Sequence, residues 1–217
     1  MALAEVNGII LKSFDYSEYD RRLILLTAER GKITVFARGV KRPGNRWMAA
    51  TQPFAFGRFR LSEGRSAYSL REVDIQNYFD GLRMDLDAYY PACFFLEIAD
   101  YYARENNDDK ELLKLLYAAL LALLSPSLDN NLVKNAFIIK AIAVNGEFPG
   151  FPSGRKLLPG TIHSINFILE TPPEKVFNFA VKEDVLEELT DLARLYGDRC
   201  MNTEFKSLEI MKKLSLA

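Results

Sequence analysis

The chain has 217 residues, and 49% of them are hydrophobic, which is enough apolar material for a buried core and excludes disorder as the main state. Lys and Arg number 28 against 29 Asp and Glu, so the net charge of −1 by itself indicates neither an acidic nor a basic partner. Two cysteines and one histidine exclude a disulfide framework and leave no zinc or catalytic cluster of these residues.

The first 80 residues alternate short apolar runs with turn residues, which is typical of β-strands. A turn is expected at Gly31, between a Leu-rich run and an Ile/Val-rich run. Five strands in so short a segment predict a small closed barrel. The expected strands cover Val6 to Ser13, Arg22 to Ala28, Lys32 to Arg38, Pro53 to Leu61 and Ala67 to Gln76.

Along the fourth expected strand, basic and aromatic side chains share one face, because side chains alternate along a strand. One face carries Ala55, Gly57, Phe59 and Leu61, and the other carries Phe54, Phe56, Arg58 and Arg60. The second face is therefore expected to be half cationic and half aromatic.

From Leu82 onward the apolar residues recur at three- and four-residue steps, which predicts amphipathic helices. Two expected helices contain the stripes from Leu86 to Ile98 and from Leu112 to Leu123. A third should begin with Asp129 or Asn130 as its cap and end at Gly146.

A loop rich in Pro and Gly is expected over residues 146–160. Apolar residues then alternate in Ile165–Leu169 and in Phe177–Val181, which predicts a short β-hairpin, followed by helices near Lys182 to Tyr196 and Thr203 to Leu214. The expected fold class is α+β, with an N-terminal barrel domain over residues 1–80 and a mainly helical domain over residues 81–217.

Basic residues are concentrated in the expected barrel. Residues 1–80 hold 13 Lys or Arg and 9 Asp or Glu, whereas residues 81–217 hold 15 and 20. Cationic side chains neutralise phosphates and release counterions, so an acid-free basic window favours nucleic-acid binding over its alternative, a solvated basic face. The 33 positions between Glu29 and Glu63 contain no acid and eight bases: Arg30, Lys32, Arg38, Lys41, Arg42, Arg46, Arg58 and Arg60.

Exposed aromatic rings would strengthen this interpretation, because unpaired bases stack on them. Phe54, Phe56 and Tyr68 are candidates, although most aromatic residues of a small barrel belong to its core. Trp47 is the only tryptophan, and we expect it to plug the barrel mouth rather than to stack on a base.

Motifs of bond-breaking chemistry are absent from the sequence: it contains no GxxxxGK[ST], GxGxxG, GxSxG or HExxH. Asp15, Glu18 and Asp20 form an acidic cluster, but it joins two expected strands, and connecting loops are commonly acidic. No enzyme activity, cofactor or metal site is therefore expected.

The first 30 residues lack a basic start followed by an apolar block, and no apolar run approaches the roughly 20 residues of a membrane-spanning helix. We therefore expect a cytoplasmic protein without membrane contact.

A series of short motifs runs through the whole chain in a fixed order. They are Gly8-Ile9-Ile10-Leu11-Lys12, Asp15-Tyr16, Glu18, Asp20-Arg21, Thr27, Gly31-Lys32, Ala37-Arg38-Gly39, Lys41-Arg42, Gln52-Pro53-Phe54, Gly81-Leu82-Arg83, Asp85-Leu86, Gly146, Pro149 and Lys206-Ser207-Leu208. In this order and spacing the chain resembles the RecO family of bacterial DNA repair proteins.

The resemblance implies an OB fold of five strands followed by a helical domain, without catalysis. It also implies binding to single- and double-stranded DNA at the nucleoid, annealing of complementary strands, and action with RecR to load RecA onto strands covered by single-stranded DNA-binding protein. The matching bases implied as DNA contacts are Lys12, Arg21, Lys32, Arg38, Lys41 and Arg42. The charge argument adds Arg46, Arg58 and Arg60.

The chain departs from the family at one place. Many relatives carry four zinc-binding cysteines after the position that matches Gly146, but residues 146–199 contain none. We therefore expect no zinc, and the predicted hairpin would replace the zinc ribbon. An alternative function stays open, in which the protein is an adaptor whose basic barrel recognises an acidic peptide tail.

Overall fold

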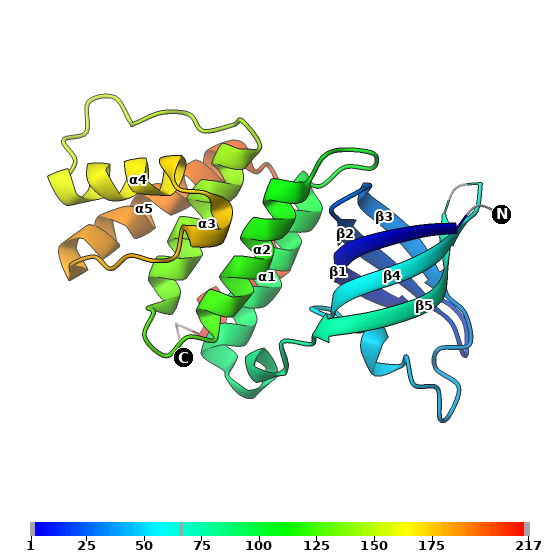
Figure 1. Cartoon of the computed structure of the whole chain (residues 1–217). Coiled ribbons are helices and arrows are strands. Elements are labelled where there is room, and N and C mark those ends of the chain that lie inside the picture. The colour runs from blue at the N-terminus through cyan, green and yellow to red at the C-terminus, as the bar shows by residue number, and fades with distance from the viewer. Residues whose placement is uncertain (1–2, 66, 215–217) are drawn as a thin grey trace. The chain divides into compact units, whose positions relative to one another are not determined.

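The computed structural model describes residues 3–65 and 67–214 (Figure 1). The chain forms two compact units, one of residues up to 80 together with 102–113, and the other of residues 81–101 and those from 114 onward. The first unit is built from strands and the second from helices. The predicted α+β class, with an N-terminal sheet and a C-terminal helical part, is confirmed at this level.

Five strands form the first unit, and all five predicted strands are present. The sheet closes on itself in the order β1-β2-β3-β5-β4, with β3 and β5 parallel and the other neighbours antiparallel. A short 3-10 helix, η1 (Ala49–Thr51), lies in the connection from β3 to β4. The strands are β1 (Leu3–Asp15), β2 (Arg21–Thr27), β3 (Gly31–Ala37), β4 (Phe56–Glu63) and β5 (Tyr68–Asn77).

The interior of the barrel is filled by alternate residues of the strands, as the two-residue period of a strand requires. Phe59 and Leu61 of β4 are fully buried there, while Arg58 and Arg60 between them are exposed. The two-faced pattern predicted for the fourth strand is therefore confirmed at these four positions.

Gly31 begins β3 with φ +61°, a conformation that side chains other than glycine rarely adopt. The backbone of residues 104–106 runs directly against this turn, because Lys32 N donates to the carbonyl of Arg104 at 2.9 Å. A Cβ atom at Gly31 would overlap that carbonyl oxygen. Glycine at position 31 is therefore required both for the chain reversal and for the close approach of the backbone of residues 104–106.

Replacing Gly31 by Ala is expected to lower the free energy of unfolding by about 2 to 4 kcal/mol, because strain at positive φ adds to the overlap with Arg104. Gly44→Ala is the matched control, since Gly44 has φ +77° but no heavy atom lies within 4 Å of the place that an added methyl group would take. That control should lose only about 1 kcal/mol. Urea denaturation followed by circular dichroism measures both, and equal losses would show that the close approach costs nothing.

The described residues form six α-helices and the short helices η2 (Asp80–Met84) and η3 (Pro173–Lys175), which belong to the second unit except for Tyr102 of α1, Lys110–Leu113 of α2 and Asp80 of η2. α3 is buried along most of its length and packs against α5 and α4. Phe137 of α3 stacks on Phe95 of α1 with ring centroids 4.1 Å apart. The helices are α1 (Leu86–Tyr102), α2 (Lys110–Leu123), α3 (Asn130–Val144), α4 (Pro159–Glu170), α5 (Glu183–Cys200) and α6 (Lys206–Leu214).

The predicted ends of α3 are confirmed. The Asp129 side chain accepts hydrogen bonds from the backbone N–H groups of Asn131 and Leu132, at 2.7 and 3.0 Å, and so caps the first turn. After the helix, Gly146 adopts φ +75° and donates to the carbonyl of Ala143.

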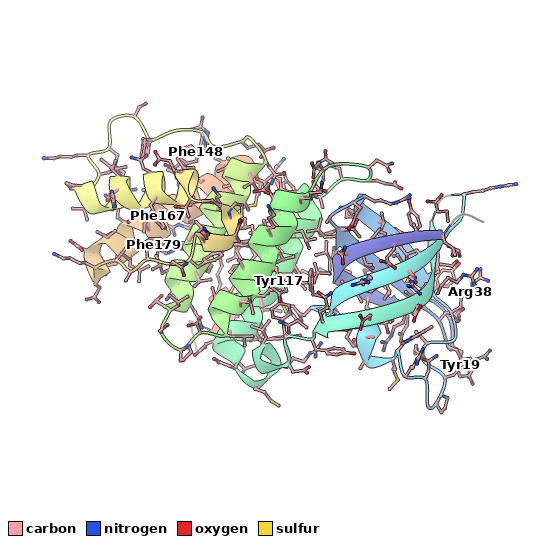
Figure 2. All side chains as sticks on the ribbon, viewed as in Figure 1. Tyr19, Arg38, Tyr117, Phe148, Phe167 and Phe179 are labelled. Atoms are coloured by element: carbon pink, nitrogen blue, oxygen red, sulfur yellow. The ribbon has the colours of Figure 1, made fainter. Side chains whose placement is uncertain are left out.

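The predicted β-hairpin between Ile165 and Val181 is wrong. Ile165–Leu169 belongs to α4, which Pro159 starts, and Phe177–Val181 has no regular structure. Phe167 and Phe179 do meet, with ring centroids 5.0 Å apart, but as a helix against an irregular segment (Figure 2). The helical period was not recognised because two buried positions of α4, Thr161 and Ser164, are polar. The apolar residues that remain, Ile165, Phe167 and Leu169, alternate as in a strand. The buried residues of α4 are Thr161, Ser164, Ile165 and Ile168.

Candidate nucleic-acid interface

The nine basic residues predicted to contact DNA all lie in the barrel unit, but they occupy different electrostatic environments. Lys12 of β1 and Lys32 of β3 are partly buried on their strands. The other seven divide into bases that hold loops of the barrel unit in place, bases that lie over aromatic rings or in solvent, and bases paired with carboxylates on neighbouring strands.

Arg21 serves the structure of the barrel. Its Nη1 donates to the carbonyl of Met48 and to Oγ1 of Thr51, both at 2.8 Å, and only 12% of its side chain is exposed. The guanidinium therefore holds the segment around η1 against β2. Little of this charge is left for a phosphate.

Lys41 is also engaged. Its Nζ lies 2.8 Å from Oδ2 of Asp15, and the hydrogen bond from Lys41 holds the pKa of the Asp15 carboxyl below its ordinary value. The backbone N–H of Lys41 donates to the carbonyl of Tyr19 at 3.0 Å. Asp20 accepts a hydrogen bond from the N–H of Gly39 at 2.7 Å, which is the main reason that the pKa of Asp20 is lowered. These contacts fasten the β1–β2 loop to the β3–β4 connection. They engage Asp15 and Asp20, two of the three acids of the predicted acidic cluster.

A second group of arginines keeps its charge exposed. Arg38, Arg42 and Arg46 lie on the β3–β4 connection, and Figure 2 shows the Arg38 side chain pointing outward from the barrel. The guanidinium carbon of Arg42 lies 5.8 Å from the ring centroid of Tyr19, and that of Arg46 lies 5.3 Å from the ring of Trp47. A cation over a ring is held in place without being neutralised. Among the described residues, none of the three forms an ion pair, but Arg38 and Arg42 are near enough to Asp20 to help lower the pKa of its carboxyl.

Arg22 of β2 belongs to the same group, although the sequence argument omitted it. Its guanidinium carbon lies 5.0 Å from the ring centroid of Phe14, which is exposed on β1. Arg22 lies before Glu29 and therefore outside the acid-free window. The sequence signal that could have identified Arg22 is its place directly after Arg21 on the expected strand, where alternation turns its side chain outward. We call Arg22, Arg38, Arg42 and Arg46 together the loop arginines.

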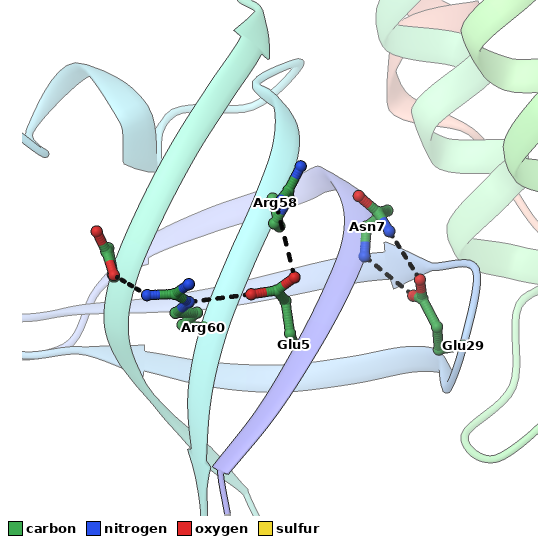
Figure 3. A network of polar contacts seen from close by, with 6 residues as sticks. Glu5, Asn7, Glu29, Arg58 and Arg60 are labelled. Atoms are coloured by element: carbon green, nitrogen blue, oxygen red, sulfur yellow. Dashed lines mark hydrogen bonds and ion pairs between the residues drawn. The ribbon is translucent and has the colours of Figure 1, made fainter.

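Arg58 and Arg60 of β4 form the third group, and both are paired (Figure 3). Arg60 lies 3.0 Å from Oε2 of Glu5 on β1 and 2.8 Å from Oε2 of Glu72 on β5, and these carboxylates raise the pKa of its guanidinium. Arg58 lies 3.7 Å from Oε1 of Glu5. The window is free of acid along the sequence but not in space, because both strands beside β4 carry carboxylates. The outer face of β4 therefore has mixed charge.

A pocket of about 470 Å³ brings the residues added by the charge argument together. Arg46 and Trp47 line it from the β3–β4 connection, and Arg58 and Arg60 line it from β4. Glu72, Val73, Asp74, Ile75 and Tyr78 complete the wall on the side of β5, together with Ala50. The six basic residues that the family resemblance implies as DNA contacts do not line this pocket.

The aromatic candidates differ in exposure. Phe54 is only 2% exposed, so its predicted availability for stacking is wrong. Tyr68 accepts a hydrogen bond from Arg30 at 2.9 Å and lies under that guanidinium, which is itself 2.7 Å from Glu63. Trp47 is partly buried and packs against the barrel core with part of its side chain. Tyr16 and Tyr19, in the β1–β2 loop, are the exposed rings that sequence reasoning did not select.

Within residues 3–65 and 67–214, no group of three or more His, Cys, Asp or Glu side chains is arranged to hold a metal ion. In the same residues, no helix is both long enough and apolar enough to cross a membrane.

Comparison with known proteins adds a family to this geometry. Residues 1–79 match the family model described as Recombination protein O N terminal, and residues 83–154 match Recombination protein O C terminal. The chain is 24% identical to the DNA repair protein RecO of Clostridium novyi over 244 aligned positions, which cover 99% of this chain and 95% of that protein. It is 35% identical to the DNA repair protein RecO of Symbiobacterium thermophilum over 149 positions, 69% of this chain and 59% of that protein.

Proposed function

Because this chain belongs to the RecO family of DNA repair proteins, we propose that it is a non-catalytic mediator of recombinational repair whose barrel binds DNA. The barrel, residues 1–80, is inferred to act as an OB-type domain that takes single- and double-stranded DNA. RecR, RecA and single-stranded DNA-binding protein are the proposed protein partners. The cytoplasm, at the nucleoid, is the proposed place of action.

The observation that carries the proposal is the group of loop arginines. Four guanidinium groups of the barrel unit are exposed, three on the β3–β4 connection and that of Arg22 on β2, and aromatic rings hold three of the four without cancelling their charge. Phosphates are the anions that such a surface attracts most strongly, because several neighbouring charges displace several counterions together. A carboxylate-paired arginine, such as Arg60, would first have to exchange partners.

Strand annealing follows from the same surface. Two complementary strands repel each other through their phosphates, and a cationic surface lowers this repulsion. Base edges are not needed for phosphate contacts and stay free to pair. The loop arginines therefore support annealing without any bond being made or broken.

The salt dependence of binding tests this proposal. If the four loop arginines each contact a phosphate of a single strand, the slope of log affinity against log salt is expected to be about −0.7 times four, or about −3. A labelled oligonucleotide titrated at several salt concentrations gives the slope by fluorescence anisotropy. A slope near zero would contradict phosphate binding.

The same titration separates the proposal from the adaptor alternative. An acidic peptide, added at the same concentration of negative charge as the oligonucleotide, should leave most of the oligonucleotide bound. The peptide has neither the phosphate spacing nor the nucleobases of DNA. Displacement of the DNA by a small excess of peptide would instead favour recognition of an acidic protein tail.

A further inference from the structure

The pocket beside Trp47 has the size of a site for one small molecule. Its volume of about 470 Å³ lies within the range of about 300 to 1,000 Å³ that is usual for ligand sites. Residues of β4, of β5 and of the β3–β4 connection line it. A single nucleotide fits this volume, whereas a base pair within a duplex cannot enter it.

The pocket wall offers an aromatic surface and a free positive charge. Trp47 and Tyr78 pack against the barrel core with part of each side chain, and the remainder is accessible from the pocket. The Arg46 guanidinium lies against the Trp47 ring and forms no ion pair with any described residue. A ring beside a free guanidinium suits a base joined to a phosphate.

The wall also offers a free hydrogen-bond acceptor. Asp74 lies opposite Arg58 in the β4–β5 pairing, but within the described residues its carboxylate has no hydrogen bond or ion pair. Glu72, by contrast, is occupied by Arg60 at 2.8 Å. A free carboxylate repels phosphate, so it would weaken a surface that contacts only the phosphates of the DNA backbone. It accepts readily from the exocyclic amino group of a base.

From this combination we propose that the pocket binds one unpaired nucleotide, with its base against Trp47 and Tyr78, its phosphate at Arg46 and an amino group of the base at Asp74. The inference rests on the proposed DNA binding and makes it more specific. A base enters only when it is unstacked and unpaired, so the pocket favours single strands over duplexes. Cytosine and adenine carry exocyclic amino groups and thymine does not, so oligo-dC is preferred to oligo-dT.

Trp47 reports directly on the pocket, because it is the only tryptophan of the chain. Oligo-dC and a duplex of equal length, both carrying a fluorescent label, are titrated against the protein while label anisotropy and tryptophan emission are recorded. We expect both DNAs to saturate by anisotropy, and only oligo-dC to quench Trp47. Saturation by oligo-dC without a change in emission, or equal quenching by the duplex, would overturn the pocket. No anisotropy change with either DNA would overturn the proposed function itself.

Asp74→Asn tests the base preference. The wild-type protein is expected to bind oligo-dC about tenfold more tightly than oligo-dT, and the variant less than about twofold, because an amide can donate to thymine as well as accept from cytosine. Glu187→Gln removes the same charge from an exposed position of α5 and should keep the tenfold ratio. An unchanged ratio in Asp74→Asn would overturn the role given to this carboxylate.

Discussion

Replacing Arg38 and Arg42 together by Glu is expected to weaken binding of a single-stranded oligonucleotide by about 100-fold at low salt. Each arginine is exposed and, although both attract the Asp20 carboxylate, neither forms an ion pair with the described residues, so each can contact a phosphate. A lost charged contact of about 1.4 kcal/mol corresponds to a factor of ten, and two such contacts give a factor of about 100. The reversed charges should add to this loss.

The salt slope provides an independent measure of the same change. Two phosphate contacts fewer should reduce its magnitude by about 0.7 times two, or about 1.4. Fluorescence anisotropy across a series of salt concentrations gives both the affinity and the slope for each variant.

A control with the same change in net charge is available in the helical unit. Lys156 and Lys206 are exposed there, and their double replacement by Glu should change the affinity by less than about threefold, because neither is among the basic residues proposed to contact DNA. Equal losses in the two double variants would mean that net charge, rather than this surface, determines binding. An unchanged affinity of the Arg38 and Arg42 variant would contradict the assignment of the surface.

Replacing Phe137 by Ala is expected to lower the free energy of unfolding by about 3 to 5 kcal/mol. Phe137 is fully buried in α3 and stacks on Phe95 with an interplanar angle of 20°. Truncation removes this aromatic contact and leaves a cavity that the surrounding helices cannot fill completely. The loss is a large part of the roughly 5 to 15 kcal/mol that stabilises a typical protein.

Leu121→Ala is the matched control for this prediction. Leu121 lies on α2 with 44% of its surface exposed, and Ala is a good helix former, so the change should cost less than about 1 kcal/mol. Urea denaturation followed by circular dichroism at the helical signal measures both variants. A loss below about 1 kcal/mol for Phe137→Ala would show that the centre of the helical unit is not close-packed around α3.

Much of the fold could be predicted because its signals are local. The strands of the barrel follow from a two-residue alternation, and the ends of α3 follow from Asp129 and Gly146, whose effects reach only a few residues. α4 was missed because Thr161 and Ser164 lie on its buried face, where Ser164 donates to the carbonyl of Gly160 at 2.8 Å. A polar side chain that satisfies its hydrogen bond within its own helix is invisible to a search for apolar periodicity.

The candidate site was less predictable than the fold. The basic window includes the β3–β4 connection, where Arg38, Arg42 and Arg46 are exposed. It treated Arg58 and Arg60 as equivalent to these, because Glu5 and Glu72 lie outside the window in sequence. The family resemblance, not the window, implied Arg21 as a DNA contact, although that side chain is committed to Met48 and Thr51.

The sequence by itself determined the five strands of the barrel, the ends of α3, and the concentration of positive charge in the barrel. Only the tertiary structure decided which of these charges remain available. The physical reason is that a charge is cancelled by whatever carboxylate comes within a few ångströms, and strand pairing brings Glu5 beside Arg60 across 55 positions of the chain. Composition and periodicity carry no information about such a meeting, because it depends on the register of two strands and not on either strand alone.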